Sequence, residues 1–270
     1  MFTKEYTEKD GIKYFHENIT LDHTDYNSQS LDQLYEAEEN HFWFIARKEF
    51  IFQKMKTQID YSSKIIEIGA GTGNVSRYLQ SKGYTNIAVG EMHRNGLKYA
   101  KSYGIEECYQ FDLLRAPFED EFTCICMFDV LEHIEDDNLA LVNIHKILKD
   151  SGHVVFTVPA HKWLWNRNDT IAGHKRRYTK KELISKLNDA GFEIENSKYF
   201  FMSIVPLLLL RSVLNKDMKG TVTSEEISTE ILIQPWINHI LLFISRVENK
   251  INTFLPNLFG GSLLIIARKK

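Results

Sequence analysis

The stretch Glu67-Ile68-Gly69-Ala70-Gly71-Thr72-Gly73-Asn74 joins a short β-branched run, residues 64–68, to the start of a helix-like segment, residues 75–80. A glycine-rich turn between a strand and a helix lets the backbone approach a ligand closely, because glycine has no side chain to block the approach. The sequence therefore predicts a ligand-binding βα unit at this position.

The residues of this loop also indicate what kind of ligand it takes. A dinucleotide fingerprint requires glycine at the sixth position from Gly69, and that position is Asn74. Glu67 lies inside the strand just before the loop, where a carboxylate would repel a phosphate and attract a cationic group. The loop thus favours a cationic ligand over a dinucleotide. A tight turn with an exposed glutamate is the alternative interpretation.

Strand-like and helix-like segments alternate from about residue 64 to 200. Further strands are expected at 86–90, 107–111, 122–128, 153–158 and 192–197, and helices at 97–102, 138–148 and 179–190. This alternation predicts an α/β fold in which a parallel sheet has helices on both faces. In such sheets ligands bind at the carboxyl ends of the strands.

Acidic residues follow three of these predicted strands. Glu91 ends the second strand, where a carboxylate can accept hydrogen bonds from a ribose, and Asp112 follows the third, where it can accept from an adenine amino group. Asp129 and His133 follow the fourth strand at the mouth of the same site. A solvated loop for Glu91 and a turn or cap for Asp112 are the alternatives.

These motifs, in this order, resemble the class I S-adenosyl-L-methionine (SAM) dependent methyltransferases, particularly the branch labelled methyltransferase type 11 or 12. The resemblance covers about residues 40–200. It implies SAM, a ligand with an ammonium and a sulfonium, as the cofactor, and no metal. The cofactor-binding residues it implies are Glu67, Gly69, Ala70, Gly71, Gly73, Asn74, Glu91, Met92, Asp112, Leu113, Asp129 and His133.

The same resemblance implies a doubly wound, Rossmann-like sheet of seven strands whose last strand is antiparallel, and residues 262–267 fit that strand. Four parts are expected along the chain. They are a helical N-terminal extension (1–60), the SAM-binding core (61–200), an apolar helical insertion before the last strand (201–260) and the last core strand (261–270). The insertion departs from the family pattern, in which the two final strands form a close pair.

A narrower resemblance concerns the acceptor side. Residues 39–44 with Arg47, and segments between 158 and 178, are similar to bacterial methyltransferases found with surface-glycan and lipid biosynthesis. Trp43, Trp163 and Trp165 fit either a lid over the cofactor or the core. The acceptor-binding candidates are Arg176, Arg177, Tyr178, Trp165 and Arg47.

Two histidines are candidates for the catalytic base, His174 and His161, because an imidazole can take a proton from a hydroxyl or an amine. The arginine pair Arg176-Arg177 suits a phosphate or carboxylate. Alternatively, these arginines pair with acidic residues such as Asp169 and hold the loop in place.

The expected function is methyl transfer from SAM to a small-molecule or lipid-/glycan-linked acceptor, with O- or N-methylation favoured. The alternatives are a nucleotide-cofactor oxidoreductase, against which Asn74 and Glu67 argue, and a non-catalytic SAM-binding or scaffold protein. Residues 201–255 are expected either to cover the acceptor pocket or to make peripheral contact with a membrane.

Composition excludes several other classes. A net charge of −3 and a pI near 6.4 provide no basic field for a nucleic acid. Cys108, Cys124 and Cys126 have neither disulfide nor zinc spacing, so buried reduced thiols in a cytoplasmic, possibly membrane-associated, protein are expected. The charged first ten residues predict no secretory signal. No window reaches the roughly 18–20 apolar residues of a transmembrane span.

Overall fold

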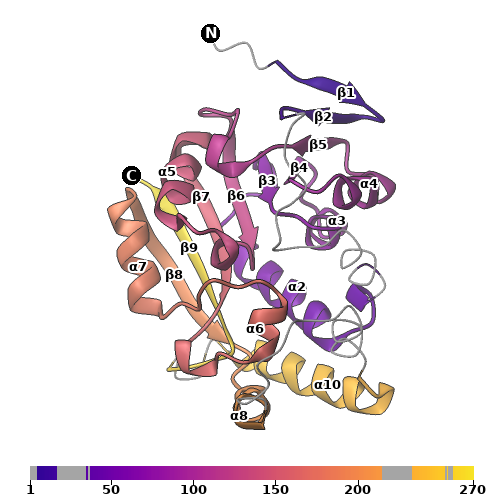
Figure 1. Cartoon of the computed structure of the whole chain (residues 1–270), viewed down its shortest axis with the longest axis vertical. Helices are drawn as coiled ribbons and strands as arrows, with labels where there is room; N and C mark the ends of the chain where they lie inside the picture. Colours follow the sequence, from indigo (N-terminus) through magenta and orange to yellow (C-terminus); the bar gives the residue numbers. More distant parts are fainter. Residues whose placement is uncertain (1–4, 17–34, 36, 215–232, 253, 255–257) are drawn as a thin grey trace.

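The computed structural model describes residues 5–16, 35, 37–214, 233–252, 254 and 258–270. Its strands form one nine-stranded sheet in the order β1-β2-β5-β4-β3-β6-β7-β9-β8, with helices on both faces (Figure 1). The strands are β1 (Thr7–Lys9), β2 (Ile12–Tyr14), β3 (Ile65–Ile68), β4 (Ile87–Glu91), β5 (Glu107–Gln110), β6 (Phe122–Phe128), β7 (Leu148–Pro159), β8 (Phe192–Phe200) and β9 (Ser262–Lys269).

The helices follow the predicted alternation. They are α2 (Phe42–Met55), α3 (Asn74–Ser81), α4 (Arg94–Ser102), α5 (Asp137–Ile147), α6 (Arg167–Ile171), α7 (Lys180–Asp189), α8 (Val205–Leu214) and α10 (Pro235–Ile251). Three short 3₁₀ turns lie at Leu113–Arg115, Leu131–His133 and Lys162–Leu164. The hydroxyl of Thr179 caps α7 by accepting a hydrogen bond from the backbone of Glu182, as its sequence predicts.

The seven strands from β3 to β9 form the predicted doubly wound core. The five strands β5, β4, β3, β6 and β7 run parallel, and β9 lies between β7 and β8, antiparallel to both. The class of fold is therefore confirmed, including the antiparallel last strand. Because the core strands are parallel, the loops after β3, β4, β5, β6 and β7 meet at one edge of the sheet.

Apolar clusters bury both faces of this sheet. On one face, α5 and α7 pack against strand residues such as Ile66 and Ile125. On the other face, α2 and α3 pack against their neighbours Ile65 and Cys124. Successive strand residues point to opposite faces, so a strand covered on both sides is continuously apolar, as the run 122–128 predicted.

The N-terminal extension differs from the expectation that it would be helical. Helix α2 and a few helical residues before it follow β1 and β2, which form a hairpin whose second strand pairs in parallel with β5. The two strands are joined at Asp10 and Gly11, both with positive φ, which is the turn that hairpins favour. Much of the extension lies outside the described residues.

The insertion before β9 contains the helices α8 and α10, and 215–232 lie outside the described residues. Helix α10 packs on α2, because Asn249 donates to the carbonyl of Ala46 at 2.9 Å and Arg246 forms a two-pronged ion pair with Glu49. Among the described helices, none is long and apolar enough to cross a membrane.

The three cysteines are buried and free, as expected. The Sγ atoms of Cys124 and Cys126 lie 4.0 Å apart on the same side of β6. Burial raises the pKa of the Cys108 thiol to about 11, so this thiol is protonated at neutral pH.

Candidate active site

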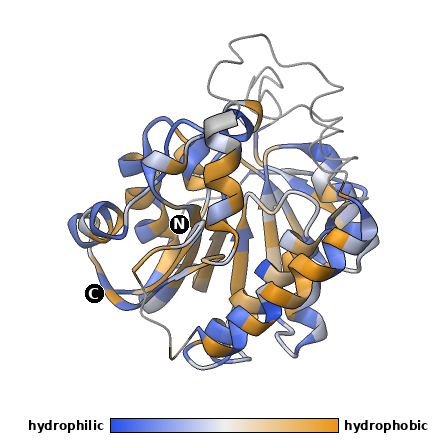
Figure 2. Ribbon diagram, turned by 90° about the horizontal axis from the view of Figure 1, so that it is seen from below, coloured by the Kyte–Doolittle hydropathy of each residue, from blue (hydrophilic) through white to orange (hydrophobic). Residues whose placement is uncertain are grey.

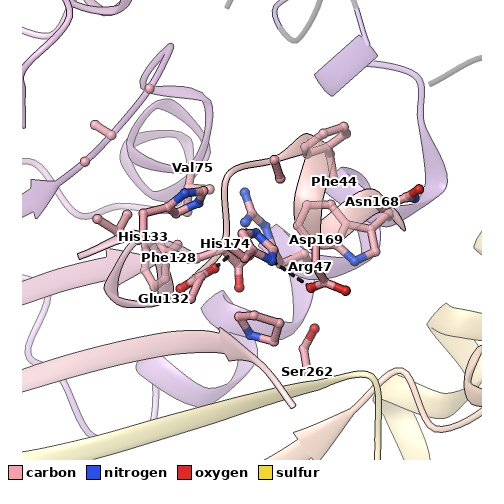
Figure 3. A pocket seen from close by; sticks show the side chains of 18 of the residues that line it. Phe44, Arg47, Val75, Phe128, Glu132, His133, Asn168, Asp169, His174 and Ser262 are labelled. Carbon is pink, nitrogen blue, oxygen red and sulfur yellow. Dashed lines mark hydrogen bonds and ion pairs between the residues drawn. The ribbon is translucent and has the colours of Figure 1, made fainter. Parts of the chain in front are cut away.

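A cavity of about 950 Å³ lies at the edge of the sheet where the parallel strands end. Its walls come from the glycine loop, from α2, from the loops after β4, β5, β6 and β7, and from the insertion. Figure 3 shows residues from these separate elements facing one another. The predicted cofactor residues that line it are Glu67, Gly69, Ala70, Gly71, Glu91, Met92, Asp112, Leu113, Asp129 and His133.

Gly73 and Asn74 do not line the cavity, which corrects their predicted direct role. Gly73 has a φ of 82° and begins α3, and a Cβ there would lie 2.9 Å from the Cβ of Ala100. Glycine at this position therefore allows the loop to pack against α4. The buried side chain of Asn74 instead accepts a hydrogen bond from the ammonium of Lys48 at 3.0 Å.

Two buried carboxyl groups border the glycine loop within the cavity. Burial raises the pKa of Glu67 to about 7, although the hydroxyl of Ser76 donates a hydrogen bond to it. Burial likewise raises the pKa of Glu38 to about 7, and the hydroxyl of Thr72 donates to this group. Buried carboxylates without a cationic partner are costly, so both groups favour a ligand that carries positive charge.

Glu91 and Asp112 hold the loops around the cavity. The carboxylate of Glu91 accepts from the backbone N–H of Gly71 at 2.8 Å and of His93 at 3.0 Å. Asp112 accepts from the backbone of Leu114 at 2.9 Å, so the cap interpretation describes its contacts well. Each carboxylate oxygen has two lone pairs, so both side chains retain capacity to accept from a ligand.

Arg47 reaches the cavity from α2 and is buried, so it is not an ordinary surface arginine. Its guanidinium forms an ion pair with Asp129, which follows β6 and has a φ of 56°. The guanidinium also lies over the ring of Trp43, 4.4 Å from the ring centroid. This ion pair fixes α2 against the loop after β6 at the mouth of the cavity.

On the other side of the cavity, Asp169 organises the loop after β7. It accepts from Nδ1 of His174 at 2.8 Å, from Nε of Arg177 at 2.7 Å and from the backbone of Asn166 at 2.9 Å. The opposite ring nitrogen of His174, Nε2, lies 3.8 Å from a carboxylate oxygen of Glu132 (Figure 3). His174 is thus held by one nitrogen and presents the other toward Glu132.

Both arginines, Arg176 and Arg177, bind groups of the protein itself. Arg177 lines the cavity but is buried, and it donates to Asp169 and to the carbonyl of Ala160. Arg176 does not line the cavity, because its guanidinium pairs with Asp137 at 3.1 Å and donates to the carbonyl of Glu135. The two arginines are therefore not brought together at the cavity, and their contacts fit the alternative in which both hold the loop.

Tyr178, Trp165 and His161 also lie away from the cavity lining. The hydroxyl of the buried Tyr178 donates to Asp137 at 2.8 Å. The ring of His161 stacks between Trp163 and Tyr199, and burial lowers its pKa. His161 is therefore not placed to act as the base.

The three candidate tryptophans have different surroundings. Trp43 lines the cavity, whereas Trp163 and Trp165 are 53% and 38% exposed and belong neither to the core nor to a lid.

Sequence reasoning missed two acidic residues and most of one wall. Glu38 lies in a polar segment with no motif, whereas Glu132 stands inside the run 129–134 that the sequence singled out. Apolar residues beyond β8 form the wall opposite the glycine loop, and their long hydrophobic run was the available signal. They are Phe201, Ile204, Leu207, Leu208, Ile233 and Leu241.

The strand order, the glycine loop and the carboxyl groups around one cavity define a class I SAM-dependent methyltransferase. The chain belongs to the methyltransferase domain family, whose model matches residues 30–197. S-adenosylmethionine is accordingly its cofactor.

Two named relatives are distant from this chain in sequence. The chain is 27% identical over 153 residues to a polyketide synthase of Dictyostelium discoideum and 22% identical over 109 residues to the ubiquinone biosynthesis O-methyltransferase of Vibrio atlanticus. These matches cover 46% and 38% of this chain, but only 6% and 46% of the two relatives.

A solved structure supports the fold. Phosphoethanolamine N-methyltransferase 2 of Haemonchus contortus, in complex with SAM, superposes with a TM-score of 0.61 at 16% identity. The superposition covers 92% of this chain and 59% of the other.

Proposed function

We propose that this chain transfers a methyl group from SAM to an oxygen or nitrogen atom of a small-molecule, lipid-linked or glycan-linked acceptor. The observation that carries the proposal is the cavity of about 950 Å³, which joins the glycine loop to an apolar wall. A site for SAM alone would not need a second wall, whereas a transferase must hold donor and acceptor together.

The cofactor end suits SAM by charge and shape. Glu67 and Glu38 offer negative charge beside the glycine loop, and Glu91 and Asp112 offer acceptors at the ends of β4 and β5. A nicotinamide dinucleotide would bring its pyrophosphate toward buried carboxyl groups, which is unfavourable. SAM, when bound, supplies a methyl group on a sulfonium that is ready for in-line displacement.

The chain's own residues position the acceptor. Arg47 and Asp129 close the mouth beside Trp43, while the pair Asp169–His174 holds one imidazole nitrogen toward the interior. That nitrogen is available for the acceptor's proton or for a group that activates the acceptor. Catalysis then rests mainly on the orientation of the acceptor toward the methyl group.

Ionisation of the buried glutamates should make cofactor binding depend on pH. Both pKa values are raised to about 7, and only the ionised forms attract the cationic groups of SAM. The ionised fraction of each group falls about tenfold as the pH is lowered from 8 to 6, so the affinity for SAM should fall by about 100-fold because both groups contribute. Titration calorimetry at each pH measures this. Glu67→Gln should reduce the fall to about tenfold, because Glu38 still titrates, whereas the control Glu107→Gln, at the far end of β5, should preserve the full pH dependence.

The insertion favours a lipid-linked acceptor. Leu208 and Leu241 face the cavity. The other side of α10 carries exposed apolar side chains at helical spacing, which form a stripe along the helix. Figure 2 shows the ribbon from below, with the hydrophobic residues along the helices of the insertion in orange. A contiguous exposed apolar surface of this kind marks an interaction site. The stripe consists of Trp236, Ile240, Phe243, Val247 and Ile251, which are 42–69% exposed.

Membrane contact through this stripe is tested by vesicle flotation. The chain should float with vesicles of phosphatidylethanolamine and phosphatidylglycerol, and Trp236→Glu/Phe243→Glu should abolish flotation because charges replace the apolar contact. The control Leu139→Glu/Val142→Glu alters two other exposed apolar residues, on α5 (40% and 43% exposed), and should still float.

Acceptor chemistry is tested with labelled methyl SAM. In cell extract, the label should accumulate in the organic-solvent fraction if the acceptor carries a lipid. Label confined to the aqueous fraction, together with failure of flotation, would indicate a water-soluble acceptor.

A further inference from the structure

Within the described part of the chain, one carboxyl group of the cavity has no hydrogen-bond partner. Glu132 is 0% exposed, and neither of its carboxylate oxygens has a hydrogen-bond partner among the described residues. It lies in the 3₁₀ turn Leu131–His133 and faces the cavity. The nearby guanidinium of Arg47 is paired with Asp129 instead. Buried charged groups are normally paired or bound to a metal ion, so an ionised Glu132 requires a cationic partner.

Two imidazoles lie beside this carboxyl group. One ligand atom each of Glu132, His133 and His174 can be chosen so that all three lie within 4.8 Å of one another. The rings of the two histidines are 4.8 Å apart at 80°, so they present edges from different directions (Figure 3). Two ligands ~2.1 Å from one ion are ~3.4 Å apart in tetrahedral geometry. The 3.8 Å between His174 Nε2 and Glu132 requires only a small contraction.

The hydrogen bond between His174 and Asp169 is typical of a metal site. Histidines that bind metals almost always donate their other ring N–H to a carboxylate or a carbonyl, which fixes the orientation of the ring. Asp169 takes this role at 2.8 Å from Nδ1, and Asp169 is itself held by Arg177 and Asn166. The imidazole of His174 is therefore oriented before any ligand arrives.

We propose that Glu132, His133 and His174 bind a divalent first-row transition-metal ion at the acceptor end of the cavity. Two imidazoles and one carboxylate on one side of an ion, with open positions opposite, suit ions such as Mn²⁺, Fe²⁺ or Zn²⁺. A bound cation supplies the positive partner that this fully buried carboxylate needs.

The ion gives the proposed methyl transfer a means of activating a hydroxyl acceptor, and in this respect the inference rests on the proposed function. An acceptor oxygen bound to the ion loses its proton to solvent more readily, because the cation stabilises the resulting anion. That oxygen then forms the new O–CH₃ bond while the S–CH₃ bond breaks. The electron pair of the broken bond stays on the sulfur of S-adenosylhomocysteine.

Metal binding is tested directly on the full chain after treatment with EDTA. Titration with Mn²⁺, followed by the loss of its free electron paramagnetic resonance signal, should show one saturable site, and Zn²⁺ should compete for it. His174→Ala and the isosteric Glu132→Gln should each weaken Mn²⁺ binding at least about tenfold. The control Glu119→Gln removes an exposed carboxylate outside the cavity lining and should bind Mn²⁺ as the unaltered chain does.

Two results would overturn the metal site: no saturable binding of either ion, or equal affinity in the unaltered chain and in both ligand variants. A SAM titration of the same samples separates this failure from failure of the proposed function. If the chain binds SAM but no metal ion, only the metal-site inference is contradicted. If the unaltered chain does not bind SAM, the proposed function is contradicted.

Discussion

Gly71→Val should lower the affinity for SAM by more than about 100-fold, which corresponds to about 2.7 kcal/mol. Gly71 lines the cavity with a φ of 55°, and its N–H donates to Glu91 at 2.8 Å. A β-branched side chain is strongly disfavoured at this φ and would stand where the ligand must approach. The substitution therefore distorts the loop and blocks its surface at once.

A second glycine provides the matched control for this strain. Gly104 also has a positive φ, 85°, but no atom lies within 4 Å of the position of its Cβ, and it does not line the cavity. Gly104→Val should thus impose similar backbone strain while leaving SAM affinity unchanged in calorimetry. Retained SAM binding by a folded Gly71→Val chain would show that the cofactor lies elsewhere.

Asp169→Ala should destabilise the protein by about 3–5 kcal/mol. The carboxylate is 1% exposed and accepts from His174, Arg177 and Asn166. Its removal leaves the guanidinium of Arg177 buried without its charged partner, which is the costly way to break a buried ion pair. Urea denaturation followed by circular dichroism measures the change in the free energy of unfolding.

Two further variants test whether the loss of stability comes from the unpaired charge of Arg177. The double variant Asp169→Ala/Arg177→Met removes both charges and should recover part of the stability. Asp150→Ala deletes an aspartate whose side chain is 92% exposed and should leave the denaturation midpoint unchanged. If Asp169→Ala denatured at the same urea concentration as Asp150→Ala, the network would have no structural role.

The core of the fold was predictable because local sequence and tertiary position agree there. The continuous apolar run of β6 is read directly from residues 122–128, since parallel strands are buried on both faces. The same logic places Glu67, Glu91 and Asp129 at one cavity, because the carboxyl ends of parallel strands meet at one edge. The hairpin of β1 and β2 is too short to give a periodic signal, although Asp10-Gly11 is a turn signature.

The acceptor side was less predictable, because its residue types fit two roles equally well. Arg176 and Arg177 suit an anionic ligand as well as they suit Asp137 and Asp169, and only the tertiary structure decides between them. Glu132 was not predicted as a site residue although it lies inside a recognised motif, because burial and the lack of a hydrogen-bond partner have no sequence signature.

The central claim, that this cavity binds SAM as a methyl donor, is tested most directly by calorimetric titration of the unaltered chain with SAM and, separately, with NAD⁺. The charges and shape of the glycine loop predict saturable binding of one SAM per chain and no detectable binding of NAD⁺. Binding of NAD⁺ in preference to SAM, or no heat with SAM at pH 8, where Glu67 and Glu38 are ionised, would contradict the account.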